Sequence, residues 1–348
     1  MSSTKYYPDS AALEVTLKCN MSCRHCGSSA TRQDRPNSLS LEEWKGVVDE
    51  LHKVGTRHIT LSGGEPFLYP HYRELIAYII GKGIKGSLIS NGLCITEKDI
   101  VFLKEAGVSH LAVSLDGNEK VHDYIRQTKG SFKKILELFA ICNKHNFVIF
   151  PVTSVNKLNY EIREEILKIL LDNKVKNWQV QIVNSFGRAG DFRDEMLIEP
   201  AQYVTLCEDI SRWQKENKGK LFIATADSIG YCHPLTDEML GDFQWEGCNA
   251  GMYVVGIESD GGVKGCLSLQ DKKFYAGNVR DRKFSEIWND DSCFAYTRLY
   301  DSSKMEGACA KCASAAQCKA GCLGMAYSVT GSIHENRYCY KALKEKNS

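Results

Sequence analysis

The chain has almost no net charge and no long apolar run. Lys and Arg total 44 against 43 Asp and Glu, which leaves a formal charge of +1 among 348 residues. Such a balance provides no global basic field to hold a nucleic-acid backbone. No apolar segment approaches the roughly 18 to 20 residues that cross a membrane, and residues 1–10 are polar without a hydrophobic signal core. We therefore expect a soluble, cytoplasmic protein without a nucleic-acid or membrane partner.

The composition is ordinary except for cysteine. With 43% hydrophobic and 25% charged residues, the chain is neither disordered nor of low complexity, and its length predicts about two domains. It has 15 cysteines, an odd number that fits a disulfide framework poorly when no secretion signal is present. Reduced cysteines in a cytoplasmic protein indicate metal ligands or redox chemistry.

The first half of the chain alternates between short apolar segments and amphipathic helical patterns. A helix over 40–54 is predicted by a capping box of Ser40 and Glu43 and by apolar residues at helical spacing. Six such alternations predict an α/β fold with a parallel sheet and right-handed crossovers, either open or closed into a barrel of six units. The candidate strands are 13–17, 58–61, 86–89, 110–115, 147–153 and 178–183. We place the first domain at 1–198.

The rest of the chain divides into a helical connector over 199–240 and a small loop-rich domain over 241–348. Eight of the cysteines lie in the second of these segments, where glycines cluster and strand candidates are short. Such a region buries little apolar surface. We expect metal centres to supply the folding free energy that its small core lacks.

Three cysteines follow the first predicted strand directly. Cys19, Cys23 and Cys26 form a Cys-x3-Cys-x2-Cys loop with no fourth cysteine nearby. Three thiolates can hold three corners of a cubic iron–sulfur cluster and leave one iron open. The alternative is a structural zinc site that takes His25 as its fourth ligand.

Polar clusters also follow the next three predicted strands. They are 62–66 (Ser-Gly-Gly-Glu-Pro), 90–92 (Ser-Asn-Gly) and 114–117 (Ser-Leu-Asp-Gly). Each alone is compatible with an ordinary turn. In parallel α/β proteins the carboxyl ends of the strands share one rim, where ligands bind. Together with the cysteine loop, the clusters predict a single site at that rim.

These motifs resemble those of the radical S-adenosylmethionine (radical SAM) superfamily, over essentially the whole chain. The resemblance implies a partial (β/α)6 TIM-like barrel, in which the open iron chelates the amino and carboxylate groups of S-adenosyl-L-methionine. An electron from a flavodoxin- or ferredoxin-type reductant then releases a 5'-deoxyadenosyl radical that abstracts a substrate hydrogen. The implied cofactor contacts are Gly63, Gly64 and Glu65 for the methionyl ammonium, Ser114 and Asp116 for the ribose, Arg126 for the methionyl carboxylate, and Val183 with 186–188 for the adenine side. Arg126 could instead be an ordinary surface arginine.

The C-terminal cysteines resemble the SPASM domain of the same superfamily, which binds two auxiliary [4Fe-4S] clusters. The resemblance implies three clusters in all. It assigns Cys248, Cys266 and Cys322 to the first auxiliary cluster, and Cys309, Cys312, Cys318 and Cys339 to the second. A pair of zinc sites is the alternative, because Cys-x2-Cys pairs are common zinc ligands.

The first auxiliary cluster is one ligand short in this assignment. Cys232 lies sixteen residues before Cys248 and could supply that ligand. It could also donate a hydrogen atom to a substrate radical, as in peptide epimerases of the family. A third possibility is a small buried thiol, which is also the simplest interpretation of the remaining cysteines. Those are Cys94, Cys142, Cys207 and Cys293.

Resemblance to SPASM-bearing members implies an enzyme that modifies peptides or proteins. The leading hypothesis is a maturase that forms a cross-link, a thioether or an epimer in a ribosomally made peptide. Because only 18 residues precede Cys19, we expect a separate protein to bind any leader peptide.

Two other functions compete with this hypothesis. Anaerobic sulfatase maturases, which make formylglycine, place a catalytic aspartate where this chain has Leu267 after Cys266. An iron–sulfur electron carrier would have no use for Glu65, Ser114 and Asp116 at one rim.

Overall fold

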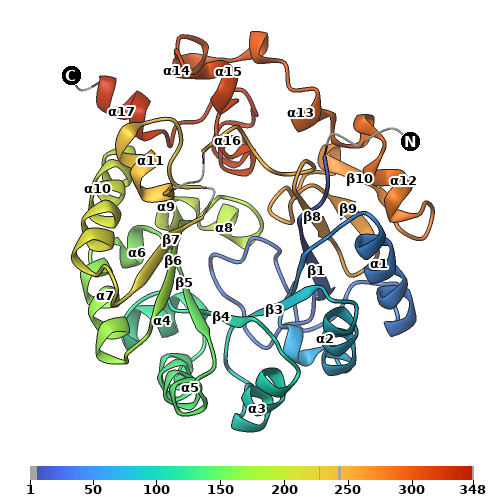
Figure 1. Ribbon diagram of the computed structural model, residues 1–348. Coiled ribbons are helices and arrows are strands. Elements are labelled where there is room, and N and C mark those ends of the chain that lie inside the picture. The colour runs from blue at the N-terminus through green and yellow to red at the C-terminus, as the bar shows by residue number, and fades with distance from the viewer. Residues whose placement is uncertain (1–5, 227, 242–243, 347–348) are drawn as a thin grey trace.

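The computed structural model describes residues 6–226, 228–241 and 244–346. They form one ten-stranded sheet with the spatial order β10-β9-β8-β1-β2-β3-β4-β5-β6-β7. The strands are β1 (Ser10–Thr16), β2 (His58–Gly63), β3 (Lys85–Ser90), β4 (His110–Ser114), β5 (Ile149–Val155), β6 (Asn177–Ile182), β7 (Phe222–Thr225), β8 (Val254–Ile257), β9 (Gly262–Lys264) and β10 (Tyr275–Asn278). The strands curve around a central lumen and helices cover the outside, which confirms the predicted partial barrel (Figure 1).

Helices connect the strands and build most of the C-terminal region. They are α1 (Leu41–Lys53), α2 (Tyr72–Gly81), α3 (Glu97–Glu105), α4 (Glu119–Arg126), α5 (Ser131–His145), α6 (Lys157–Tyr160), α7 (Arg163–Asp172), α8 (Arg188–Asp191), α9 (Arg193–Met196), α10 (Pro200–Glu216), α11 (Pro234–Leu240), α12 (Phe284–Trp288), α13 (Ala295–Arg298), α14 (Gly307–Ala310), α15 (Ala315–Cys318), α16 (Leu323–Thr330) and α17 (Tyr340–Lys346). Among the described residues, none of these helices has the length and apolar composition of a membrane span.

The outer face of β1 shows how the barrel wall is packed. Leu13 and Val15 are almost fully buried in the same apolar cluster as Trp44 of α1. Neighbouring residues of a strand point to opposite faces, so the alternate residue Glu14 points into the lumen. The capping box that predicted α1 is present, since the Ser40 N–H donates to Glu43 Oε2 at 2.8 Å.

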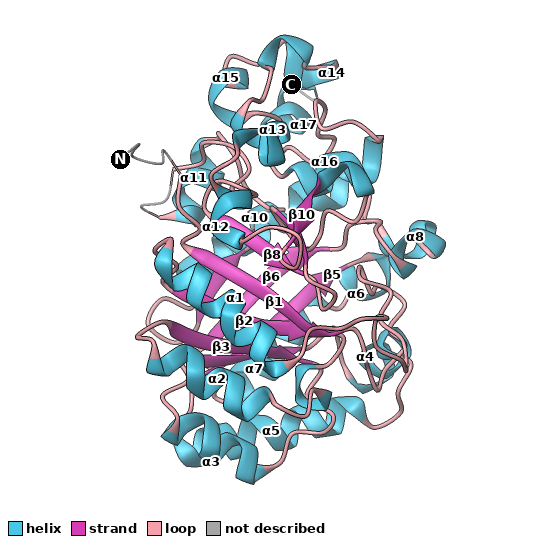
Figure 2. Cartoon of the chain, turned by 90° about the vertical axis from the view of Figure 1, so that its right-hand side faces the viewer, coloured by secondary structure: helices cyan, strands magenta, loops and turns pink. Residues whose placement is uncertain are grey.

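The sheet is wider than the six strands that the alternation predicts. The connector contributes β7, which pairs in parallel with β6. At the other edge β8 comes from the C-terminal region and pairs in parallel with β1, with Ser10 opposite Val254 and Leu13 opposite Ile257. The C-terminal region is therefore joined to the barrel through a shared sheet, while α14, α15 and α17 lie beyond the strands at one end of the molecule (Figure 2).

Candidate active site and cysteine groups

The three-cysteine loop leaves the carboxyl end of β1 and opens onto a cavity of about 220 Å³. Cys19 and Cys23 are buried, whereas Cys26 is half-buried, and all three are free thiols. The Cys19 N–H donates to Thr31 O at 2.6 Å, which closes the loop on itself. Burial raises the pKa of Cys19 and Cys23, so metal binding would be needed to make them thiolates at neutral pH. We call this space the cluster-side cavity.

The two glycines after β2 lie directly against the backbone that leads into the cysteine loop. The Gly64 N–H donates to Thr16 O at 2.7 Å. A Cβ at Gly63, where φ is +142°, would lie 2.1 Å from the same oxygen, and a Cβ at Gly64 would lie 2.4 Å from Lys18 O. Only glycine permits this approach. Both glycines line the cluster-side cavity and leave it free of side chains on that wall.

Glu65 is completely buried beside the same cavity. Its carboxylate accepts hydrogen bonds from Ser90 Oγ and from the Asn91 N–H, both at 2.8 Å. Burial raises its pKa to about 7 in spite of these donors. Glu65 thus joins the carboxyl ends of β2 and β3, and its assignment to a methionyl ammonium stays a prediction.

Asp116 and Arg126 form a buried ion pair at the rim. Arg126 Nε and Nη2 lie 2.7 and 2.6 Å from Asp116 Oδ2, and Arg126 Nη1 lies 3.7 Å from Cys23 Sγ. The Ser154 N–H donates to Asp116 Oδ1, and His25 Nε2 lies 3.3 Å from Oδ2. Although burial opposes ionisation, the guanidinium holds the pKa of Asp116 well below its usual range. Arg126 is only 8% exposed, so it is not a surface arginine.

The turn over 186–188 packs onto the other side of the cysteine loop. Arg188 Nε donates to Cys23 O at 3.0 Å, and Nη1 donates to Ala30 O at 2.7 Å. A Cβ at Gly187 would lie 2.6 Å from Cys26 O. Nothing in the local sequence pattern signalled Arg188 as a clamp on this loop, because its partners lie more than 150 positions away.

Comparison with protein families and relatives fits this geometry. The model of the radical SAM superfamily matches residues 13–170, and that of the SPASM iron–sulfur cluster-binding domain matches residues 248–313. An AdoMet-dependent heme synthase of Methanosarcina barkeri is 30% identical over 344 residues, which cover 95% of this chain and 96% of the relative. The chain belongs to the radical SAM superfamily. Thiols and a side-chain-free glycine wall around one cavity fit a cluster with bound S-adenosylmethionine.

Other relatives and solved structures extend the comparison. A mycofactocin maturase, MftC, of Mycobacterium tuberculosis is 28% identical and covers 89% of this chain and 77% of its own length. SuiB of Streptococcus suis with bound S-adenosylmethionine has a TM-score of 0.76 at 17% identity, and covers 95% of this chain and 76% of its own. A structure of anSMEcpe with bound AdoMet also reaches 0.76, at 19% identity and with coverage of 97% and 95%. These structures share the fold of this radical SAM enzyme.

A second cavity, also of about 220 Å³, adjoins the first inside the barrel. We call it the inner cavity. It shares His25, Ser62 and Gln181 with the cluster-side cavity and is bounded on its other side by Val183 and Leu267. Residues of the radical SAM domain and of the SPASM region therefore line one space.

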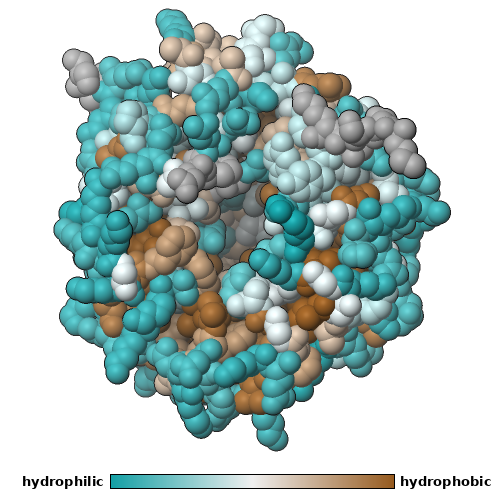
Figure 3. All heavy atoms as spheres, viewed as in Figure 1, coloured by the Kyte–Doolittle hydropathy of each residue, from teal (hydrophilic) through white to brown (hydrophobic). Residues whose placement is uncertain are grey.

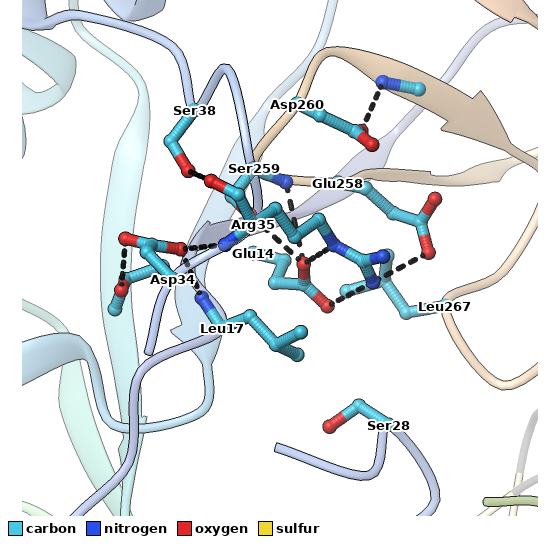
Figure 4. A network of polar contacts seen from close by, with 12 residues as sticks. Glu14, Leu17, Ser28, Asp34, Arg35, Ser38, Glu258, Ser259, Asp260 and Leu267 are labelled. Carbon is cyan, nitrogen blue, oxygen red and sulfur yellow. Dashed lines mark hydrogen bonds and ion pairs between the residues drawn. The ribbon is translucent and has the colours of Figure 1, made fainter. Parts of the chain in front are cut away.

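Glu14, which also lines the inner cavity, belongs to a buried network of charged residues (Figure 4). Arg35 Nε lies 2.7 Å from Glu14 Oε1, and Arg35 Nη2 lies 3.0 Å from Glu258 Oε1. Lys264 Nζ donates to Glu258 at 2.7 Å, and the Ser259 hydroxyl donates to Glu14 at 3.2 Å. Burial raises the pKa of Glu14 in spite of Arg35. The network links β1 to β8 and β9, and the sequence pattern did not signal it.

The cysteines assigned to the first auxiliary cluster lie around one small core. Cys248 and Cys266 pack in the same apolar cluster as Leu323, the residue that follows Cys322 at the start of α16. Among the residues that the structure describes, no three His, Cys, Asp or Glu side chains are arranged to hold a single metal ion. The SPASM model, which describes an iron–sulfur cluster-binding domain, covers Cys248, Cys266, Cys309 and Cys312.

The cysteines assigned to the second cluster also come together, and Cys232 lies with them. Cys339 interacts electrostatically with Cys309 and Cys312, and Cys318 interacts with Cys339 and Cys232. The Cys232 thiol also approaches Trp245 O at 3.9 Å. Cys232 is thus beside the second group, and it lines neither the inner nor the cluster-side cavity. Its role as ligand or hydrogen donor stays a prediction.

The remaining cysteines are assigned to no cluster, although Cys207 interacts electrostatically with Cys339 of the second group and Cys94 with Glu65. Cys142 and Cys207 are fully buried in the apolar core, where burial raises the pKa of both to about 12. Cys293 is half-buried, and Arg282 Nη1 approaches its sulfur at 3.8 Å. These environments suit inert thiols.

Proposed function

We propose that this radical SAM enzyme abstracts a hydrogen atom from a residue of a ribosomally made peptide. The observation that supports this proposal is the charge of the residues that line the inner cavity. Among the described residues that line the inner cavity, Glu14 is the only acidic side chain, and there is no lysine or arginine. Of the two arginines of the cluster-side cavity, Arg188 donates to backbone carbonyls, and Arg126 is bound to Asp116 and is assigned to the methionyl carboxylate of the cofactor.

The lack of lysine and arginine in the described lining of the inner cavity favours a peptide substrate over a tetrapyrrole. Relatives named AdoMet-dependent heme synthase and Fe-coproporphyrin III synthase handle tetrapyrroles, whose carboxylate side chains are normally bound by arginine or lysine. A peptide instead offers amide N–H and carbonyl groups. Ser62, Ser154, Gln181 and Asn184, which line the inner cavity, are suited to such groups.

The cofactor assignment supports the same reaction class. Cys19, Cys23 and Cys26 would hold the cluster that binds S-adenosylmethionine. The reduced cluster and S-adenosylmethionine together would supply the 5'-deoxyadenosyl radical. Gly63 and Gly64 would leave room for the methionyl group. The seven C-terminal cysteines would hold two auxiliary clusters, which makes three [4Fe-4S] clusters in the proposed holoenzyme. A flavodoxin- or ferredoxin-type reductant and a separate leader-binding protein complete the proposed partners.

Formylglycine formation is the second candidate because a carboxylate does reach the relevant cavity. Leu267 occupies the position at which sulfatase maturases have aspartate, but Glu14 lines the same cavity. Burial raises the pKa of Glu14, but Oε1 already accepts from Arg35 and Ser259, and these donors compete with a substrate for the carboxylate. We therefore place this activity second.

The decisive experiment supplies the reconstituted, reduced enzyme and S-adenosylmethionine with candidate peptides encoded beside its gene, in deuterated water. We expect 5'-deoxyadenosine together with a peptide mass change, either the loss of two hydrogens or the gain of one deuterium. A parallel reaction contains Fe-coproporphyrin III. Loss of carbon dioxide from the porphyrin, with unchanged peptides, would refute the proposal.

Two cysteine variants provide the matched control. Cys23→Ala should abolish 5'-deoxyadenosine formation because it removes a ligand of the cofactor-binding cluster. Cys293→Ala should retain it, since Cys293 belongs to none of the cysteine groups. Equal turnover by both variants would contradict the ligand assignment.

A further inference from the structure

The last strand of the sheet has an open edge. β7 pairs with β6 on one side and with no described strand on the other. The Phe222 N–H donates to Lys176 O at 2.8 Å and the Ala226 N–H to Val180 O at 3.0 Å, so the backbone groups of these alternate residues face β6. In a parallel pair the intervening residues face away, which points the N–H groups of Ile223 and Thr225 to the open edge.

A groove of about 740 Å³ runs along this edge. It is lined on one side by β7 and on the other by Met239 and Trp245. Phe222 is 63% exposed, the same fraction as Leu299 and the highest among the exposed large apolar side chains of the described residues. Figure 3 shows hydrophobic surface over β7, beside the central hollow of the molecule. Proteins usually protect an open strand edge that carries exposed apolar side chains, because it invites pairing with another chain.

The described part of the groove lining carries a surplus of positive charge. Lys176, Lys218 and Lys220 line it, and none of the three pairs with a carboxylate of the described residues. The only acidic side chain in the described lining is Glu238, whose Oε2 lies 3.0 Å from Lys215 Nζ. The complementary ligand is therefore acidic.

The strand direction relates the groove to the active-site rim. Because β7 is parallel to β6, its carboxyl end lies at the same rim as those of β1 to β6, where the cofactor motifs stand. The groove lining continues past that end to Ala226 and Ile229. A chain bound along β7 would therefore continue at the rim.

We propose that the open edge of β7 binds an acidic, extended segment of the peptide substrate as an added strand. The inference rests on the proposed function and names how the peptide is held outside the inner cavity. The N–H groups of Ile223 and Thr225 would donate to main-chain carbonyls of the segment, as in other cases of strand addition. Ile223 O already accepts from Gln214 Nε2 at 2.8 Å, so the segment would displace this side-chain amide where it passes Ile223. Phe222 would pack against apolar side chains of the segment, and the three lysines would select acidic ones.

Binding is tested with a fluorescent octapeptide of alternating Glu and Val, titrated with the full-length holoenzyme and followed by anisotropy. We expect saturable binding, at least tenfold weaker for a Lys218→Glu/Lys220→Glu double variant. The matched control is Lys133→Glu/Lys134→Glu on the exposed face of α5, which should bind as wild type. A Lys–Val octapeptide should not bind.

The strand-addition geometry has its own probe, an octapeptide of the same sequence with alternate backbone nitrogens methylated. It keeps the charges and side chains but loses hydrogen-bond donors, and its affinity should fall at least tenfold. Equal affinity of the methylated peptide, or of the Lys218→Glu/Lys220→Glu variant, would overturn the proposal. So would self-association of the enzyme that disappears in this variant, because the edge would then serve a second copy.

Failure of this inference is distinguishable from failure of the proposed function. If a peptide is modified but with the same KM in wild type and in the double lysine variant, only the groove assignment is wrong. If 5'-deoxyadenosine forms and no peptide changes mass, the proposed function is wrong, while binding of the Glu–Val probe still reports on the groove.

Discussion

Arg35 is the cation between two buried carboxylates, and Arg35→Met tests how the SPASM region is joined to the barrel. Its guanidinium donates to Glu14 at 2.7 and 3.3 Å and to Glu258 at 3.0 Å. Methionine retains much of the aliphatic bulk but removes the charge and all three donors. Glu14 would keep the bonds from Ser259, and Glu258 would keep those from Lys264 and Tyr275.

The expected loss in the free energy of unfolding follows from the burial of Glu14 and Glu258, which would no longer be paired with Arg35. Removing one partner of a buried ion pair costs about 3–5 kcal/mol, because the other charge stays buried without compensation. The Arg35 side chain is 22% exposed, so we expect the lower end, about 3 kcal/mol at neutral pH.

The stability that Arg35→Met loses should depend on pH, and the direction of this dependence can be worked out. Burial already raises the pKa of Glu14, and loss of the guanidinium would raise it further in the folded variant. Above the unfolded value of about 4.3, the folded variant then binds more protons than the unfolded chain, and its stability falls as the pH rises. The deficit relative to wild type should therefore be largest at neutral pH and smaller near pH 5.

Anaerobic urea unfolding at pH 7.5 and 5.5, followed by circular dichroism, measures the deficit. The matched control is Arg212→Met on α10, which removes an arginine that is 43% exposed and pairs with the exposed Glu164 and Glu216. That variant should lose about 0.2–1 kcal/mol. An Arg35→Met variant that unfolds like the control, or whose deficit grows at the lower pH, would refute the reasoning.

Two further predictions concern Gly64 beside the cluster-side cavity and His110 of β4. Gly64→Ala should prevent S-adenosylmethionine binding in equilibrium dialysis, because its Cβ would lie 2.4 Å from Leu17 O and Lys18 O, whereas nothing lies within 4 Å of a Cβ in the control Gly46→Ala. Equal binding by both variants would contradict this. Burial lowers the pKa of His110 to about 4, so the unfolded chain binds the extra proton between about pH 6.5 and 4, and stability falls as the pH falls. His110→Asn should therefore lose less stability than wild type between pH 7 and 5 in urea unfolding, and an unchanged pH slope would count against it.

The sequence predicts those parts of the fold that are encoded by local pattern. The capping box of Ser40 and Glu43 and the apolar spacing of the following residues define α1 because both signals act within a few turns of chain. The six strand candidates match β1 to β6, and the cysteine loop lies at the predicted rim. The motifs at the carboxyl ends of these strands come together because parallel strands share one rim.

What the sequence did not predict depends on pairing over long separations. β7 has four residues and follows a helix in a mostly helical segment, so no alternation marked it. The pairing of β8 with β1 joins residues more than 240 positions apart, and the Arg35–Glu258 contact spans 223. Periodicity carries no information about such partners, although an arginine in a polar loop and a glutamate after a short strand are both visible in the sequence.

The Asp116–Arg126 pair shows how a motif can be located correctly while its contacts follow from packing. The resemblance assigned Asp116 to the ribose and Arg126 to the methionyl carboxylate, yet in the structure they bind each other. A guanidinium has five N–H donors. Nε and one N–H of Nη2 serve Asp116, and one N–H of Nη1 is directed at Cys23. One donor remains on each terminal nitrogen, so Arg126 can hold a ligand carboxylate without releasing Asp116. The ion pair fixes the guanidinium between Asp116 and the cysteine loop, and its contact with a methionyl carboxylate stays a prediction.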